Sequence, residues 1–243
     1  MQVPSNLKCW QSTQLRVVCG ADSSHAAFES VAEEATRLGF AYCSFGMKGP
    51  VPLAAPRVVW CSTYPQAWQQ LYDQRGYMQQ DPTVRHAIVS DEPVRWPGDL
   101  YHQAPDFFDE AARHGLRHGV AIPRRDARGM VSLFSVVRSD EPLSAAEYET
   151  KKERLLWLAV LCHEGMLKSW GELLRDDSGV ELSVREMDVL RWTCEGKTSS
   201  DVAQILSISE ATVNFHTRNA CAKLGTTNRT AAAVRAALLG LLW

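Results

Sequence analysis

The 243-residue sequence has no run approaching the roughly 18 consecutive apolar residues that indicate a membrane-spanning helix. Its first residues also contain no continuous apolar core of the secretory signal-peptide type. Neither sign of charge dominates, because the sequence contains 26 Lys and Arg residues and 28 Asp and Glu residues. These absences argue against an integral membrane protein and against a globally basic nucleic-acid-binding protein. We therefore expect a cytoplasmic protein with no membrane partner.

Paired cysteine motifs are absent as well. The seven cysteines are scattered along the chain and none forms a C-x-x-C motif, so we expect free thiols and neither a disulfide framework nor a zinc ribbon. His114 and His118 have the i, i+4 spacing of a metal pair, but Gly115 lies between them and no third ligand is evident. We therefore expect no metal site.

Enzyme motifs are missing too. No G-x-S-x-G is present, and Gly196-Lys197-Thr198 resembles the end of a phosphate-binding loop whose required earlier glycine is replaced by Arg191. The sequence thus predicts a protein that is not an enzyme and carries no cofactor.

Positive charge without negative charge is confined to the C-terminal end. Residues 211–243 contain four basic residues and no acidic residue, whereas residues 180–210 contain three basic and six acidic residues. Such a segment can present a basic face to phosphates although the whole chain has a net charge of −2. An ordinary solvated helix accounts for the same pattern, so charge alone leaves DNA binding open.

Residues 1–172 combine helical and strand patterns and are predicted to form one domain. Apolar spacing predicts helices over residues 24–38, 66–75, 106–114 and 144–170. Strands are predicted from β-branched and aromatic residues over 40–46, 57–62, 119–124 and 130–138. Strands separated by helices, with a late hairpin, favour an α/β/α sandwich on a mostly antiparallel sheet. The apolar face of the helix at 144–170 is expected to lie mostly in the core, with part of it as the alternative contact for a partner subunit.

The run LLRDDSG at residues 173–179 predicts a linker, because Asp, Ser and Gly favour turns. Residues 180–243 then predict a second, all-α domain. Four helices fit the pattern, over residues 183–195, 199–206, 210–224 and 229–241. The tight turn at 207–209 makes the middle pair a helix-turn-helix. The predicted fold class is therefore α+β, a sandwich followed by a four-helix helix-turn-helix domain.

Aromatic residues with polar tips recur between residues 64 and 96. Tyr64, Trp68 and Tyr72 are spaced four apart and share one helix face, and Asp81-Pro82 and Trp96 follow. Such side chains suit an apolar pocket that orients one polar head group, with Asp81 accepting from an amide N–H. Ordinary core packing, with Asp81 as a turn residue before proline, is the alternative that the residues leave open.

Two regions of the chain, in matching order, resemble the LuxR-type quorum-sensing regulators. The N-terminal match consists of Tyr64-x3-Trp68, Tyr72, Asp81-Pro82, Trp96 and Gly119. The C-terminal match consists of Leu182-Ser183-x-x-Glu186-x-x-Val189-Leu190, Gly196-Lys197-Thr198, Ile208-Ser209-x-x-Thr212-Val213-x-x-His216-x-x-Asn219 and Lys223-Leu224. The runs Arg117-His118-Gly119 and 135–139 (SVVRS) are most similar to the QscR-like subgroup.

This resemblance implies a receptor for an N-acyl-homoserine lactone. In such a receptor Trp68 donates to the lactone carbonyl, Asp81 accepts from the amide N–H, and Tyr64 donates to the acyl carbonyl. The remaining implied ligand residues are Ser135 at the acyl carbonyl, Trp96 on the lactone ring, Tyr72 in the pocket lining and Ser44 as a further polar contact.

The resemblance also implies a homodimer that binds double-stranded DNA at an inverted-repeat operator. Asn214 and Arg218 are placed at base edges on the recognition helix, and Lys197, Thr198, Thr212, His216 and Lys223 at the DNA backbone. Asn214 departs from the Lys or Arg common at its position, so the operator sequence is expected to differ.

Three alternatives compete with this interpretation. A regulator switched by phosphorylation shares the C-terminal motif, but the acidic residues of positions 1–60 fit a helix better than a phosphorylation site. A lactone-degrading enzyme needs a metal cluster or nucleophile that the sequence does not show. The third alternative stays open: a regulator that responds to a different small molecule, or one that the lactone releases from DNA.

Overall fold

The computed structural model describes residues 5–174 and 179–243. Contacts divide the described residues into two compact units, with all strands and helices α1 to α6 in the first and α7 to α10 in the second. The first unit extends to Leu174, so residues 173 and 174, predicted as linker, belong to a helix instead; residues 175–178 of that linker lie outside the described residues. Among the described helices, none combines the length and apolar character that a bilayer crossing requires.

The first unit is built on a five-stranded, fully antiparallel sheet with the order β2-β1-β5-β4-β3. Its strands are β1 (Tyr42–Lys48), β2 (Val58–Ser62), β3 (Val94–Trp96), β4 (His118–Arg125) and β5 (Val131–Arg138). The predicted sandwich and its antiparallel sheet are confirmed. The sequence missed β3, because a three-residue edge strand is too short to show an alternating pattern.

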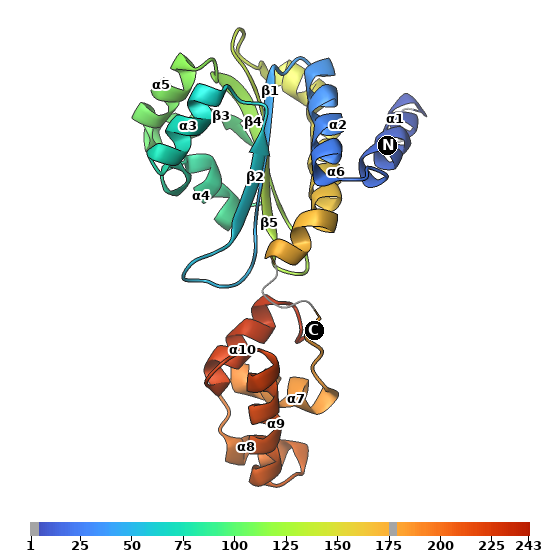
Figure 1. Cartoon of the computed structure of the whole chain (residues 1–243), viewed down its shortest axis with the longest axis vertical. Coiled ribbons are helices and arrows are strands. Elements are labelled where there is room, and N and C mark those ends of the chain that lie inside the picture. Colours follow the sequence, from blue (N-terminus) through green and yellow to red (C-terminus); the bar gives the residue numbers. More distant parts are fainter. Residues whose placement is uncertain (1–4, 175–178) are drawn as a thin grey trace. The chain divides into compact units, whose positions relative to one another are not determined.

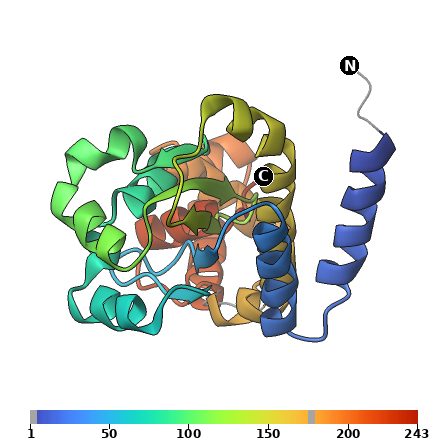
Figure 2. The same ribbon diagram turned by 90° about the horizontal axis from the view of Figure 1, so that it is seen from above.

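Helices cover both faces of this sheet (Figure 1). On one side lie α1 (Ser5–Cys19), α2 (Ser24–Arg37) and α6 (Ala145–Leu174). On the other side lie α3 (Gln66–Gln74), α4 (Pro82–Val89) and α5 (Pro105–Arg113), together with the 3₁₀ turns η1 (Tyr77–Gln79) and η2 (Gly98–Gln103). The view from above shows α1 standing beside α2 as the outermost element of its side (Figure 2). The sequence missed α1 and α4, and α6 runs four residues past its predicted end.

Alternation along the strands separates two cores. Phe45 and Phe134 point to the aliphatic core under α2 and α6. Residues of the opposite parity, such as Ser44 and Ser135, face the aromatic core under α3 and α5. Gly119 permits the close approach of β4 and β5, since a Cβ there would lie 2.1 Å from the Val136 carbonyl oxygen.

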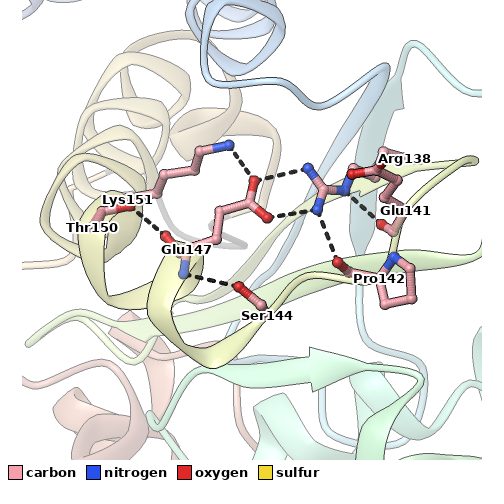
Figure 3. Close-up of polar contacts among 7 residues, drawn as sticks. All are labelled: Arg138, Glu141, Pro142, Ser144, Glu147, Thr150 and Lys151. Atoms are coloured by element: carbon pink, nitrogen blue, oxygen red, sulfur yellow. Dashed lines mark hydrogen bonds and ion pairs between the residues drawn. The ribbon is translucent and has the colours of Figure 1, made fainter.

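One ion-pair network ties the end of β5 to the start of α6 (Figure 3). Arg138 binds Glu147 with two guanidinium nitrogens, Nη1 at 2.8 Å and Nη2 at 2.7 Å, and Lys151 Nζ lies 2.5 Å from the same carboxylate. The guanidinium also donates to the carbonyls of Glu141 and Pro142. The hydrogen bonds that Glu147 accepts from Arg138 and Lys151 lower its pKa to about 2, with Arg138 as the main cause.

The second unit contains α7 (Val184–Cys194), α8 (Ser199–Leu206), α9 (Glu210–Lys223) and α10 (Arg229–Leu238). Side chains cap the helix starts, with capping boxes formed by Ser183 before α7 and by Thr198 before α8. Ser209 caps α9 through the backbone N–H of Thr212. The tight turn between α8 and α9 places Ser207 in the left-handed conformation, with φ of 54°. The predicted four-helix, helix-turn-helix architecture is confirmed, although α10 ends earlier than expected.

Candidate ligand and DNA sites

The aromatic residues predicted to bind a ligand share one cluster in the first unit. Trp68 is 1 % exposed, and its ring stacks on Tyr77 with centroids 5.6 Å apart. Tyr72 packs against the same indole in an edge-to-face arrangement, with ring centroids 5.9 Å apart. Tyr64 lies 6.4 Å from Trp96, which is 6 % exposed. The four predicted rings therefore come from α3, its preceding turn and β3, and they meet against one face of the sheet.

Asp81 is buried at the start of α4, where it caps the helix. Its Oδ1 accepts from the backbone N–H of Thr83 at 2.8 Å and from the Thr83 hydroxyl at 2.7 Å, and its Oδ2 accepts from the Tyr72 hydroxyl at 3.1 Å. Burial raises the pKa of Asp81, and these hydrogen bonds offset part of the rise. A carboxylate oxygen accepts about two hydrogen bonds, so Oδ2 retains capacity for a further donor.

Tyr64 brings the predicted serines into the same site. Its phenol oxygen accepts from Ser44 Oγ at 3.0 Å, and Ser135 lies directly across from Ser44 on β5. Burial raises the pKa of Tyr64, while hydrogen bonds with Ser44 and Ser135 lower it in part. The phenol therefore stays protonated at neutral pH and keeps a hydrogen to donate.

The cluster also contains residues that sequence reasoning missed. Thr83 supplies two of the Asp81 hydrogen bonds, and the run Asp81-Pro82-Thr83 is a helix-start signature that could have identified it. Trp60 of β2 lies 6.0 Å from Tyr72, and Phe107 of α5 lies 5.6 Å from Trp68. Nothing local in the sequence links these two rings to the site, because only the sheet and α5 bring them there.

The two histidines considered as a metal pair do not share a helix face. His114 follows α5 and lies 5.6 Å from the Trp68 ring, whereas His118 begins β4. Within the described residues, no group of three or more His, Cys, Asp or Glu side chains is arranged to hold a metal ion.

In the second unit, α9 presents an exposed stripe. Asn214 and Arg218, predicted at base edges, are both exposed and lie one turn apart. Asn214 Oδ1 accepts from Ser199 Oγ of α8 at 2.9 Å, which orients its amide. Phe215, which follows Asn214 and precedes Arg218 by three positions, is 52 % exposed. Sequence reasoning missed Phe215, although an apolar residue on the outer face of a recognition helix is itself a signal.

The residues predicted at the DNA backbone have mixed surroundings. Lys197 and Thr198 are exposed at the start of α8, where the Thr198 hydroxyl donates to Asp201 at 2.7 Å. The Thr212 hydroxyl lies 2.8 Å from Ser209 Oγ at the start of α9. Both threonines therefore also take part in the polar contacts that begin helices.

His216 and Lys223 complete the predicted set. The ring of His216 packs against Phe215 with centroids 5.5 Å apart. Lys223 Nζ is 2.8 Å from the Glu186 carboxylate and 3.1 Å from the Glu181 carbonyl oxygen. This pairing joins α9 to α7, so a phosphate contact by Lys223 would compete with it.

Comparison with known proteins matches both units. A family model described as "Autoinducer binding domain" covers residues 23–166, and one described as "Bacterial regulatory proteins, luxR family" covers residues 180–236. The chain is 37 % identical to the transcriptional activator protein AnoR of Acinetobacter nosocomialis over 97 % of this chain and all of that protein. It is 36 % identical to the quorum-sensing regulator RhlR of Pseudomonas aeruginosa over 90 % of each chain. The solved structure of SdiA in complex with octanoyl-rac-glycerol matches with a TM-score of 0.79 at 30 % identity, covering all of this chain and 98 % of that one.

Proposed function

Because the chain belongs to the LuxR-type family of quorum-sensing transcription regulators, we propose that it binds an N-acyl-homoserine lactone and, as a homodimer, an inverted-repeat DNA operator. Family membership makes it a ligand-dependent regulator and not an enzyme. One observation carries the choice of lactone: the buried Asp81 carboxylate, an acceptor, lies in the same cluster as the donors Trp68 and Tyr64. An N-acyl-homoserine lactone has one amide N–H for the acceptor Asp81, two carbonyl groups for the donors Trp68 and Tyr64, and an apolar tail for the surrounding cluster.

Each side chain of the cluster has a role in this proposal. Trp68 donates its indole N–H to the lactone carbonyl, and Asp81 accepts from the amide N–H through Oδ2. The acyl carbonyl accepts from Tyr64, supported by Ser44 and Ser135. Trp96 packs on the lactone ring, and Tyr72 lines the site while orienting Asp81.

Ligand binding would act on DNA binding through stability. A ligand that binds only the folded first unit stabilises it by mass action, about 2.7 kcal/mol at a ligand concentration of 100 Kd. It shifts the protein toward the DNA-binding state only as far as it prefers that state. We propose that the lactone favours the dimer and thereby activates DNA binding.

DNA recognition is proposed for the exposed stripe of α9. Arg218 can bind guanine through two hydrogen bonds, and Asn214 can do the same with adenine. Lys197, Thr198, Thr212 and His216 contact the DNA backbone, and Lys223 chiefly secures α9 against α7. In a homodimer, half-sites then lie about one helical turn apart.

A second candidate ligand is an acyl ester without an amide. SdiA, whose structure this chain resembles, forms a complex with octanoyl-rac-glycerol, and that molecule has hydroxyl groups in place of the amide N–H. In this chain a glycerol hydroxyl could donate to Asp81 in the same position. The alternative to ligand-activated DNA binding is a regulator that binds DNA without ligand and is released from DNA when the ligand binds.

Thermal unfolding of the purified full chain, freed of carried-over ligand, tests the proposal. The probes are N-acyl-homoserine lactones of increasing tail length, with octanoyl glycerol as the competing class. We expect a subset of lactones to raise the unfolding temperature more than octanoyl glycerol at equal concentration. Stabilisation by the ester alone would select the second candidate, and stabilisation by neither would refute the lactone receptor.

A further inference from the structure

A row of serines crosses three neighbouring strands on the ligand-facing side of the sheet. Ser44 of β1 lies directly opposite Ser62 of β2 on one side and Ser135 of β5 on the other. Directly opposite residues of an antiparallel pair project from the same face. Since Ser44 reaches Tyr64, all three hydroxyls belong to the face that carries the aromatic cluster.

The outer serine of this row differs from the other two. The Ser44 hydroxyl donates to the Tyr64 phenol oxygen, and Ser135, directly opposite Ser44, is close enough to lower the pKa of Tyr64. The Ser62 hydroxyl oxygen is shielded from solvent, yet it has no hydrogen-bond partner among the described residues. An unsatisfied buried hydroxyl costs about 1–3 kcal/mol of the folding free energy unless something pairs with it.

The nearest residue of β2 on the same face as Ser62, Trp60, contacts the aromatic site. Trp60 precedes it by two positions on β2, so both side chains project from the same face, and Trp60 contacts Tyr72. The opposite face of β2 is different, because Val59 and Cys61 pack against the aliphatic core. Ser62 therefore belongs to the aromatic site.

The order of the strands gives the position of Ser62 along a bound lactone. Trp96 lies on β3 at one edge of the sheet, Ser135 and Ser44 lie on the central strands, and Ser62 lies on β2 at the other edge. The proposed function places the lactone ring at Trp96 and the acyl carbonyl at Ser44 and Ser135. A tail that continues in the same direction across the sheet then reaches β2 and Ser62. Neighbouring strands are about 4.8 Å apart. The third acyl carbon lies two bonds of about 1.5 Å each beyond the carbonyl carbon, so an oxygen on it comes within one strand spacing of the amide carbonyl.

We propose that Ser62 recognises an oxygen on the third carbon of the acyl chain, so that the preferred ligand is a 3-oxo or 3-hydroxy N-acyl-homoserine lactone. A serine hydroxyl donates to a keto oxygen and accepts from a hydroxyl, so both substituents satisfy it. An unsubstituted chain leaves it unpaired. This inference rests on the proposed function and specifies the ligand class of that same site.

The test compares three lactones of one tail length, unsubstituted, 3-oxo and 3-hydroxy, titrated against the full chain by thermal unfolding. The tail length is the one that stabilises the wild-type protein most. We expect at least one oxygenated lactone to bind the wild type about threefold to tenfold more tightly than the unsubstituted one. In Ser62→Ala this ratio falls to about one, while affinity for the unsubstituted lactone is kept.

Two further variants separate the substituent from the head group. Ser44→Ala weakens the binding of all three lactones by a similar factor and leaves the ratio of their affinities unchanged, because Ser44 acts at the acyl carbonyl through Tyr64. Ser62→Cys has a side chain of similar size but a weaker hydrogen-bond donor, so it reduces the ratio of affinities for the oxygenated and the unsubstituted lactone. This variant replaces Ser62→Ala in the test if the alanine variant is poorly folded. Without ligand, Ser62→Ala should unfold at or above the wild-type temperature, since it removes an unpaired buried hydroxyl.

The outcomes distinguish this inference from the function on which it rests. If the three lactones bind the wild type equally, or if Ser62→Ala keeps the wild-type ratio, the assignment of Ser62 is overturned while the receptor stands. If no lactone binds, the proposed function fails and this inference fails with it.

Discussion

Replacing Trp68 with phenylalanine tests the proposed lactone contact most directly. Trp68 packs on Tyr72, Tyr77 and Phe107, so it supports the aromatic core as well as the site. Truncation to alanine costs about 3–5 kcal/mol, a large part of the roughly 5–15 kcal/mol that stabilises a typical domain. Loss of ligand response in Trp68→Ala would therefore mix unfolding with lost binding. Phenylalanine keeps a stacked ring and removes only the indole N–H and part of the ring volume.

The expected size of the effect follows from mass action. At a lactone concentration of 100 wild-type Kd, ligand binding raises the free energy of unfolding by about 2.7 kcal/mol. Losing one hydrogen bond weakens binding by about threefold to tenfold. The stabilisation by ligand then falls to between about 1.4 and 2.1 kcal/mol at the same lactone concentration.

Urea unfolding with and without lactone measures this difference. Val31→Ala is the matched control, because Val31 is fully buried in the aliphatic core on the other face of the sheet and its truncation costs about 2 kcal/mol. The control should lower the free energy of unfolding yet keep the full ligand increment. If Trp68→Phe also keeps the full increment, its N–H does not contact the ligand and the carbonyl assignment is refuted.

Three further predictions concern the DNA helix, the buried carboxylate and the ion-pair network. Arg218→Ala should weaken specific operator binding by about 5- to 150-fold while the lactone still stabilises the protein, measured by fluorescence anisotropy and thermal unfolding; unchanged operator affinity would contradict its role. Because burial raises the pKa of Asp81, lactone affinity should fall as the pH is lowered through that pKa, and a pH dependence that persists in Asp81→Asn would assign the effect to another group. The pKa of Glu147 is lowered from 4.5 to about 2, so its contribution to stability is complete above pH 4.5 and is lost as the pH falls toward 2. In Glu147→Gln the free energy of unfolding should change less between pH 4.5 and pH 2, as measured by urea unfolding at a series of pH values. If the variant loses as much stability in acid as the wild type, another group causes that loss.

Local sequence determined most of the elements. Helix starts such as Ser183 with Glu186 were readable because capping depends on residues only three positions apart. The turn at 207–209 and the apolar spacing of α8 and α9 determined the helix-turn-helix in the same way. Short or weakly patterned elements, α1, α4 and β3, escaped detection because their formation depends on packing against distant segments.

The candidate ligand residues were named from their spacing and from the family resemblance, but only the tertiary structure shows how they are held. Tyr72 and Asp81 are nine positions apart, and their hydrogen bond depends on the turn that brings α3 and α4 together. Trp60 and Ser62 carry no local signal at all, since sheet register alone places them on the ligand-facing side. The sequence by itself determined the chemistry of the donors and acceptors, because side-chain type is local. The fold decided which of them are buried, paired or left with an unused hydrogen bond, because burial and pairing depend on residues far apart in the chain.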